Sequence, residues 1–172
     1  ITGQIPPPGI PLTAGLVVTL QVSSGNVISL DVNLANIISL DSAELVRDTL
    51  RPGEQIELTL RWKSRVDKIN QAYKVFVHLL GPTGNLIAQM DQEPQGGRAP
   101  TTSWRKDAIG YDGIVTDPYV LQVPNDAPRG KYQLRVGMYP LNNPSVRLTV
   151  VSSGRTTAEN NSILLKELTI GP

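Results

Sequence analysis

The chain of 172 residues contains no cysteine and a single histidine, His78. The absence of cysteine excludes disulfides, thiolate catalysis and every cysteine-ligated zinc or iron–sulfur site. One histidine is too few for a metal site built from several imidazoles. The 16 Lys and Arg against 15 Asp and Glu give a formal net charge of +1, which provides no basic field for nucleic acid or anionic lipid. We therefore expect no nucleic-acid partner.

Long hydrophobic runs and helical periodicity are also scarce. No stretch approaches the ~18 consecutive apolar residues that a membrane helix needs, so we expect no direct membrane insertion of this segment. Residues 43–50 are the only short stretch whose pattern favours a helix. The first residue is Ile1 rather than methionine, and we expect the chain to be a piece cut from a larger protein.

What dominates the sequence is the alternation of apolar and polar residues that is typical of strands. A polar turn at 23–26 separates two alternating stretches and predicts a hairpin. Residues 73–80 are apolar on both faces except for Lys74 and His78, a pattern that predicts a central strand covered on both sides. The predicted strands are 16–22, 28–34, 55–62, 73–80, 86–90, 114–123, 131–139, 145–151 and 162–170. We predict an all-β fold, an antiparallel β-sandwich of about nine or ten strands, immunoglobulin-like or jelly-roll-like.

Proline and glycine divide the chain into a short leader and one domain. Residues 1–14 are rich in both and favour an extended linker or a segment lying on a surface. Residues 15–172 are predicted to form a single β-sandwich domain, in which 15–35 are either an integral part or an added hairpin. Residues 91–113 form a long predicted loop, and its aromatic residues favour an ordered excursion packed on the domain.

Many short segments, in a fixed order, carry a resemblance to a known kind of domain. They are Leu50 to Glu54, Leu60-Arg61-Trp62, Val75 to Leu80, Gly84, Gln89-Met90-Asp91, Pro94, Pro100 to Trp104, Asp117, Pro128 to Tyr132 and Val136 to Tyr139. Over about residues 36–170 the chain resembles a β-sandwich domain on the C-terminal side of multi-spanning membrane proteins of Chloroflexi-type bacteria. Those proteins look like family-39-type glycosyltransferases that use lipid-phosphate sugars. Lys106-Asp107-Ala108 departs from the pattern of many relatives.

The resemblance implies an accessory domain rather than an enzyme. Such a domain lies outside the cytoplasm and is tethered to the cell membrane through the rest of its parent chain. The expected partners are a glycan and the membrane part of its own parent protein. The resemblance thus implies a noncatalytic domain that binds or positions envelope glycans or braces the membrane part. The alternative is a structural or protein–protein interaction domain of the immunoglobulin-like kind, with no glycan ligand.

The residues themselves offer one candidate glycan site, centred on Trp104 in the long loop. Sugar rings pack on indole and phenol rings, while charged side chains bind the hydroxyls. The candidate site residues are Trp104, Arg105, Tyr111 and Asp91. Trp62 ends an alternating strand on its apolar side and is predicted to lie in the core. A loop tryptophan also commonly plugs one end of a sandwich, and this alternative is favoured for Trp104.

Acidic residues of the same region form a weaker candidate site, for calcium. Ca²⁺ takes six to eight oxygen ligands, and Asp91, Asp112 and Asp117 could contribute, with Glu93 and Asp107 nearby. No EF-hand pattern is present, and acids at strand ends more often cap turns through their own backbone. No cofactor is therefore predicted, and a structural calcium ion stays open.

His78 is the only imidazole available for catalysis. It lies inside a predicted strand, and no G-x-S-x-G nucleophile elbow accompanies it. The favoured interpretation is a half-buried strand histidine hydrogen-bonded to a loop backbone. A lone histidine defines no reaction without a partner in reach, so we predict that the domain is not an enzyme.

Overall fold

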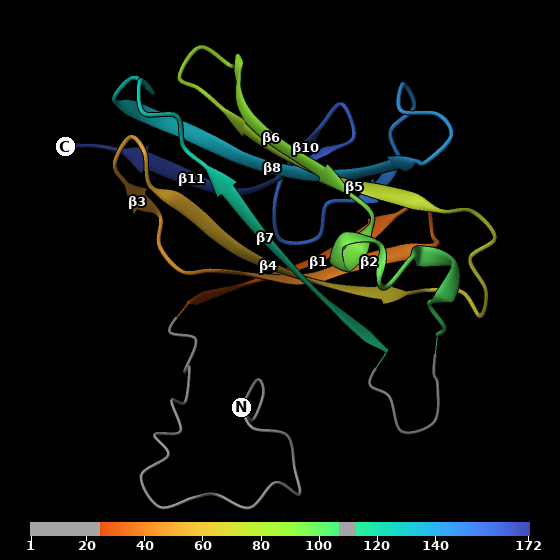
Figure 1. Cartoon of the computed structure of the whole chain (residues 1–172). Helices are drawn as coiled ribbons and strands as arrows, with labels where there is room; N and C mark the ends of the chain where they lie inside the picture. Colours follow the sequence, from red (N-terminus) through yellow and green to blue (C-terminus); the bar gives the residue numbers. More distant parts are fainter. Residues whose placement is uncertain (1–24, 107–112) are drawn as a thin grey trace, which may run out of the picture.

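The computed structural model describes residues 25–106 and 113–172 (Figure 1). These residues form eleven strands and two 3-10 helices. The strands are β1 (Asn26–Leu34), β2 (Ile38–Leu45), β3 (Thr49–Leu50), β4 (Gln55–Ser64), β5 (Tyr73–Leu80), β6 (Leu86–Gln92), β7 (Ile114–Gln122), β8 (Gly130–Pro140), β9 (Val150–Ser152), β10 (Ala158–Glu159) and β11 (Ser162–Ile170). The 3-10 helices are η1 (Pro94–Gly97) and η2 (Thr101–Ser103). The predicted all-β class is confirmed.

The strands form two sheets that lie face to face (Figure 1). Sheet A has the order β7-β4-β2-β1-β9, and sheet B has the order β10-β11-β8-β5-β6 with β3 also paired to β11. Every pairing is antiparallel except that of β3 with β11, which is parallel. The domain is an antiparallel β-sandwich, as the sequence predicts.

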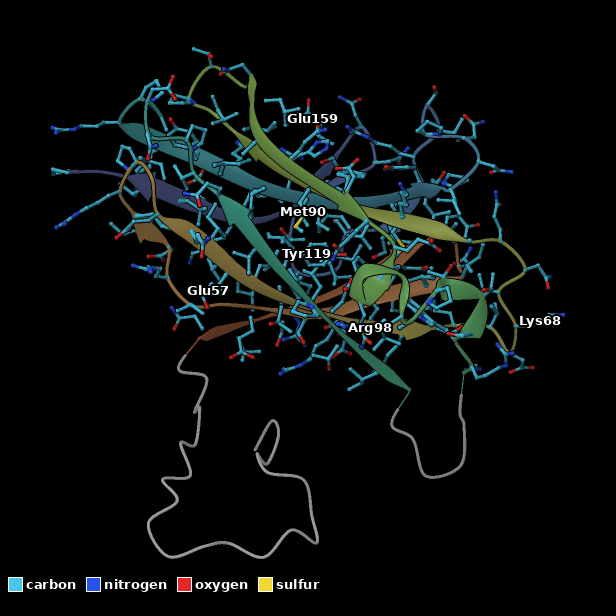
Figure 2. All side chains as sticks on the ribbon, in the orientation of Figure 1. Glu57, Lys68, Met90, Arg98, Tyr119 and Glu159 are labelled. Atoms are coloured by element: carbon cyan, nitrogen blue, oxygen red, sulfur yellow. The ribbon has the colours of Figure 1, made fainter. Side chains whose placement is uncertain are left out.

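Alternate residues of the strands fill the space between the sheets. In β4 the side chains of Ile56, Leu58, Leu60 and Trp62 are buried, and their neighbours in the chain are exposed or half-buried. Figure 2 shows Tyr119 of β7 between the two sheets. Burying one large apolar side chain contributes roughly 1.5–3 kcal/mol, so this alternation is what drives the two sheets together.

Residues 43–50 form no helix, and the expectation of a helical segment is wrong. Residues up to Leu45 belong to β2, and Thr49–Leu50 form β3. The register of β2 against β4 shifts between Leu40 and Ser42, so that Ser42 and Ala43 are both buried. A bulge of this kind breaks the period of two before residue 43, and residues 43–50 then span the end of β2, a connection and the start of β3, so they show no alternation.

The ends of the predicted strand list also differ from the structure. The first strand of the predicted hairpin, at 16–22, lies outside the described residues. Its predicted partner corresponds to β1, which pairs with β2 and β9 and so is part of sheet A. The strand predicted at 145–151 is reduced to β9, because residues 141–149 form a loop. Within the described residues, no helix has the length and apolar character needed to cross a membrane.

The long excursion after β6 is ordered from residue 93 to residue 106, where η1 and η2 form. Residues 107–112 lie outside the described part. Residues 81–85 form the hairpin connection between β5 and β6: the N–H of Gly81 donates to the carbonyl of Asn85, and Gly84 has a φ of 79°. That left-handed conformation favours glycine.

Candidate functional site

Trp104, the centre of the predicted glycan site, is a core residue. It directly follows η2 and is 4% exposed. Its indole N–H donates to the carbonyl of Ala99 at 2.9 Å, and its ring belongs to the hydrophobic core. A ring that is covered by protein cannot stack on a sugar. Trp104 therefore plugs the sandwich, the alternative that the sequence analysis favours.

Of the other predicted site residues that the structure describes, Arg105 lies beside Trp104 and Asp91 lies elsewhere. Arg105 is exposed and donates to the carbonyls of Thr102 and Trp104. Trp104 and Arg105 line a pocket of about 260 Å³, whereas Asp91 lines a different pocket. Tyr111 lies outside the described residues. The predicted glycan site is thus divided between two places wherever the structure describes it.

Asp117 of β7 is fully buried and holds the long loop in place. Its Oδ1 accepts the backbone N–H of Gln95 at 2.7 Å, and its Oδ2 accepts the hydroxyl of Tyr119 at 2.7 Å and the indole N–H of Trp62 at 3.3 Å. Burial raises the pKa of this carboxyl group, and the three hydrogen bonds oppose the rise. Asp117 is a structural anchor of the turn at Gln95.

This arrangement bears on the calcium candidates. Both oxygens of Asp117 already accept protein hydrogen bonds, and Asp91 lies on the outer face of sheet B. Asp112 lies outside the described residues. Within 25–106 and 113–172, no group of three His, Asp or Glu side chains could hold a metal ion. The described acids therefore do not converge on a common point.

A second pocket lies on the outer face of sheet B, and we call it the sheet B pocket. Its volume is about 160 Å³. Its lining residues are Phe76, His78, Gln89, Asp91, Tyr139, Pro144 and Arg147. The strand register explains why the sheet residues meet, because Phe76 pairs with Asp91 and His78 pairs with Gln89 across β5 and β6. Tyr139 comes from β8, on the other side of β5.

Phe76 forms the floor of the pocket and is 1% exposed although it points away from the core. It fits because its partner in β8 is Gly137: a Cβ atom there would lie 2.4 Å from Phe76 Cζ and 2.9 Å from the carbonyl oxygen of Asn161. The rings of His78 and Tyr139 lie 4.6 and 6.4 Å from the Phe76 ring, centre to centre. β5 is central, between β8 and β6, and its outer face is covered at Phe76 and half-buried at Lys74, His78 and Leu80.

The loop 141–149 supplies the outer wall of the pocket. The guanidinium of Arg147 lies 4.7 Å above the centre of the Phe76 ring and donates one hydrogen bond to the carbonyl of Asn160 at 3.1 Å. The backbone N–H groups of Leu141 and Leu148 anchor the two ends of the loop to Ala72 and Met138. Arg147 is thus held in place before any ligand arrives.

Asp91 is the acceptor of the pocket. Its Oδ2 accepts the hydroxyl of Tyr139 at 3.0 Å, while its Oδ1 is buried and has no hydrogen-bond partner among the described residues. His78 Nε2 is 3.7 Å from Oδ1, longer than a hydrogen bond. Burial and the bond to Asp91 raise the pKa of Tyr139 to about 12, so its hydroxyl keeps the proton that it donates.

His78 is half-buried, as predicted, but its neighbour is a carboxylate rather than a loop backbone. The side chain is 17% exposed. Burial lowers its pKa, the charge of Asp91 opposes that shift, and the charge of Arg147 adds to it. His78 is therefore neutral at pH 7.

Phe76 and Arg147 are not among the site residues that the sequence predicts. The sequence does carry one signal for Phe76: it is an aromatic residue on the strand face that also carries Lys74 and His78. Arg147 gave no signal, since its position depends on the path of a loop that the sequence predicts as a strand. Of the predicted glycan-site residues that the structure describes, Asp91 alone lines the sheet B pocket, beside His78.

No family model and no curated protein matches the sequence. Solved structures of similar fold include the C-terminal domain of Wzt, with 8% identity, a TM-score of 0.47, and coverage of 86% of this chain and 77% of that chain. They also include a CARDB domain from Pyrococcus furiosus, crystallised in complex with di-metal ions, with 10% identity, a TM-score of 0.36, and coverage of 89% and 94%. Neither similarity carries an argument about function.

Proposed function

We propose that this chain is a noncatalytic accessory domain that binds envelope glycans through the sheet B pocket. One observation carries the proposal: a carboxylate, a guanidinium and an amide, from Asp91, Arg147 and Gln89, line one pocket on the outer face of the sheet. Sugar hydroxyls both donate and accept hydrogen bonds, so such a mixed set suits them. The pocket is smaller than the roughly 300–1,000 Å³ sites of drug-sized ligands, and it takes one sugar residue or a chain end.

The surroundings of His78 support a noncatalytic role. Glycoside hydrolysis ordinarily uses a pair of Asp or Glu side chains that flank the scissile bond. Among the described residues that line the sheet B pocket, Asp91 is the only carboxylic acid, and its Oδ1 lies 3.7 Å from His78 Nε2. This lining suits binding and orienting a ligand, and it lacks the second carboxyl group that such hydrolysis uses.

The wider setting of the proposal rests on the family resemblance. It makes the domain part of a membrane glycosyltransferase-like protein, located outside the cytoplasm and tethered through the rest of the parent chain. The domain's partners are then a glycan and the membrane part of the same protein. Its work is to bind or position envelope glycans, or to brace the membrane part.

A glycan array tests the binding role. The full chain, displayed in several copies on a carrier to gain avidity, is compared with Arg147→Ala and with Arg155→Ala as the matched control. Arg155 is exposed and pairs with Asp31 at 3.0 Å, outside the sheet B pocket. We expect Arg147→Ala to weaken binding about tenfold or more and Arg155→Ala to leave it unchanged. Absence of binding to any glycan would contradict the proposal.

The burial of Trp104 favours the second candidate, a structural or protein–protein interaction domain with no glycan ligand. Without an accessible tryptophan, the stacking platform that many sugar-binding surfaces use is absent at that position. Absence of array signal for both the wild type and Arg147→Ala would also favour this candidate, whereas equal positive signals would place a glycan site outside the sheet B pocket.

A further inference from the structure

We infer that the sheet B pocket selects an uncharged, hydroxyl-bearing sugar residue over the corresponding uronic acid and free-amine sugar. This inference rests on the proposed function. The pocket is lined by one fixed negative group, Asp91, and one fixed positive group, Arg147. The lining therefore carries no net charge, so the attraction of a charged ligand to one of these groups is opposed by repulsion from the other.

The neighbouring charges on the same face do not change this balance. Arg135 is 7% exposed, and its guanidinium donates to Ser162 and Gln133 and lies 4.0 Å from Glu159. Lys74 lies on the outer face of β5 but does not line the pocket. His78 faces Asp91, Arg147 and the Phe76 ring, and it is neutral because burial and Arg147 lower its pKa.

Each type of charged ligand meets one of the two fixed groups with the wrong sign. A uronate would place its carboxylate beside Asp91, which is held by the hydroxyl of Tyr139. An ammonium group would lie beside Arg147, which is held by Asn160 and by the Phe76 ring. Repulsion by that group opposes the attraction to the other one, and the charged ligand also loses hydration in a partly buried site, so both ligands lose affinity relative to a neutral sugar.

A neutral hydroxyl, in contrast, finds both donors and acceptors. Arg147 has five N–H donors, and one of them is used by Asn160. Oδ2 of Asp91 accepts from Tyr139 and has a further acceptor site, since a carboxylate oxygen can take two hydrogen bonds. Gln89 is exposed, and its amide makes no hydrogen bond with the described residues. A pair of adjacent hydroxyls can therefore donate to Asp91 and accept from Arg147.

The test uses the full chain and three matched ligands: a methyl hexoside, the hexuronic acid and the 2-amino-2-deoxy sugar of the same configuration. Binding is followed by NMR through the imidazole signals of His78, the only histidine of the chain. Asp91→Asn removes the negative charge with little change in shape, and Arg147→Gln removes the positive charge. Arg155→Gln is the control, and amide spectra confirm that each variant is folded.

For the wild type we expect the neutral sugar to bind about tenfold more tightly than either charged one. Asp91→Asn should gain about tenfold for the uronic acid, and Arg147→Gln should gain about tenfold for the amino sugar. A wild type that binds the uronic acid or the amino sugar as well as the neutral one overturns the inference and leaves the proposed function standing. A preference that neither variant changes also overturns it. If no sugar moves the His78 signals, both the inference and the proposed function fail.

Discussion

Asp117 shows how a single side chain can connect two parts of the molecule. It lies in β7, is fully buried, and accepts hydrogen bonds from Gln95, Tyr119 and Trp62. Gln95 has a φ of 54°, a strained conformation for a residue with a side chain. The bond from its N–H to Asp117, at 2.7 Å, compensates for that strain and fixes the turn.

The substitution Asp117→Asn should therefore destabilise the domain. The amide has one acceptor oxygen in place of two, so at least one buried donor loses its partner at a cost of about 1–3 kcal/mol. Urea unfolding followed by circular dichroism measures the loss. Asp126→Asn is the control because Asp126 is exposed. Equal stability of Asp117→Asn and the wild type would contradict the anchoring role.

The same variant should change how stability depends on pH. The pKa of Asp117 is raised in the folded protein above its ordinary 3.8. The stability that Asp117 contributes is therefore fully present below about pH 3.8 and declines as the pH rises through the folded-state pKa. The advantage of the wild type over Asp117→Asn should shrink from about pH 4 upward. Urea unfolding at several pH values measures it, and a growing advantage would be inconsistent with a raised pKa.

Substitution of Gly137 should lower the free energy of unfolding because of the atoms around it, and not because of its backbone conformation. A Cβ atom there would lie 2.4 Å from the Phe76 ring. Overpacking of this kind costs about 1–3 kcal/mol, so Gly137→Ala should lower the free energy of unfolding by that amount and displace the pocket floor. Gly171→Ala, which meets no atom within 4 Å, is the control. The Phe76→Leu background should relieve part of the loss, and full stability of the single variant would contradict the close fit.

At the scale of elements, the strands with an uninterrupted alternation could be predicted and the irregular ones could not. The buried residues of β4 follow the period of two, and the hairpin after β5 carries its glycine at the left-handed position. β2 could not be predicted from alternation because the bulge at Ser42 changes which alternate residues of the strand are buried. The sheet B pocket combines three strands with a loop, and their meeting depends on register and loop path, which no local pattern encodes.

The contribution of the loop 141–149 to the pocket can be measured at His78. The positive charge of Arg147 lowers the pKa of His78, and the negative charge of Asp91 raises it. Arg147→Ala should therefore raise the pKa of His78 relative to the wild type, and Asp91→Ala should lower it further. An NMR titration of the only imidazole in the chain reads both values directly. Unchanged values in both variants would mean that the loop and β6 do not face His78.

At the scale of the whole molecule, neither sheet is built from one continuous stretch of chain. β1 and β2 lie in sheet A, β3 lies in sheet B, β4 returns to sheet A, and β5 and β6 are again in sheet B. β7, β8, β9 and β10 then alternate between the two sheets (Figure 1). Because the chain crosses between the layers so often, most strands of one sheet are joined along the chain to strands of the other.

The described core is also a single cluster to which both sheets contribute, and it includes Trp62 and Trp104. Unfolding should therefore be a single cooperative transition, as is usual for domains with one core. Tryptophan fluorescence reports on the core and far-ultraviolet circular dichroism reports on the strands, so their urea midpoints and slopes should coincide. Trp104→Phe leaves Trp62 as the only indole and should keep the two probes coincident at a lower midpoint, because Trp104 loses its bond to Ala99. A fluorescence change that precedes the loss of strands would instead mean that the loop region opens independently of the two sheets.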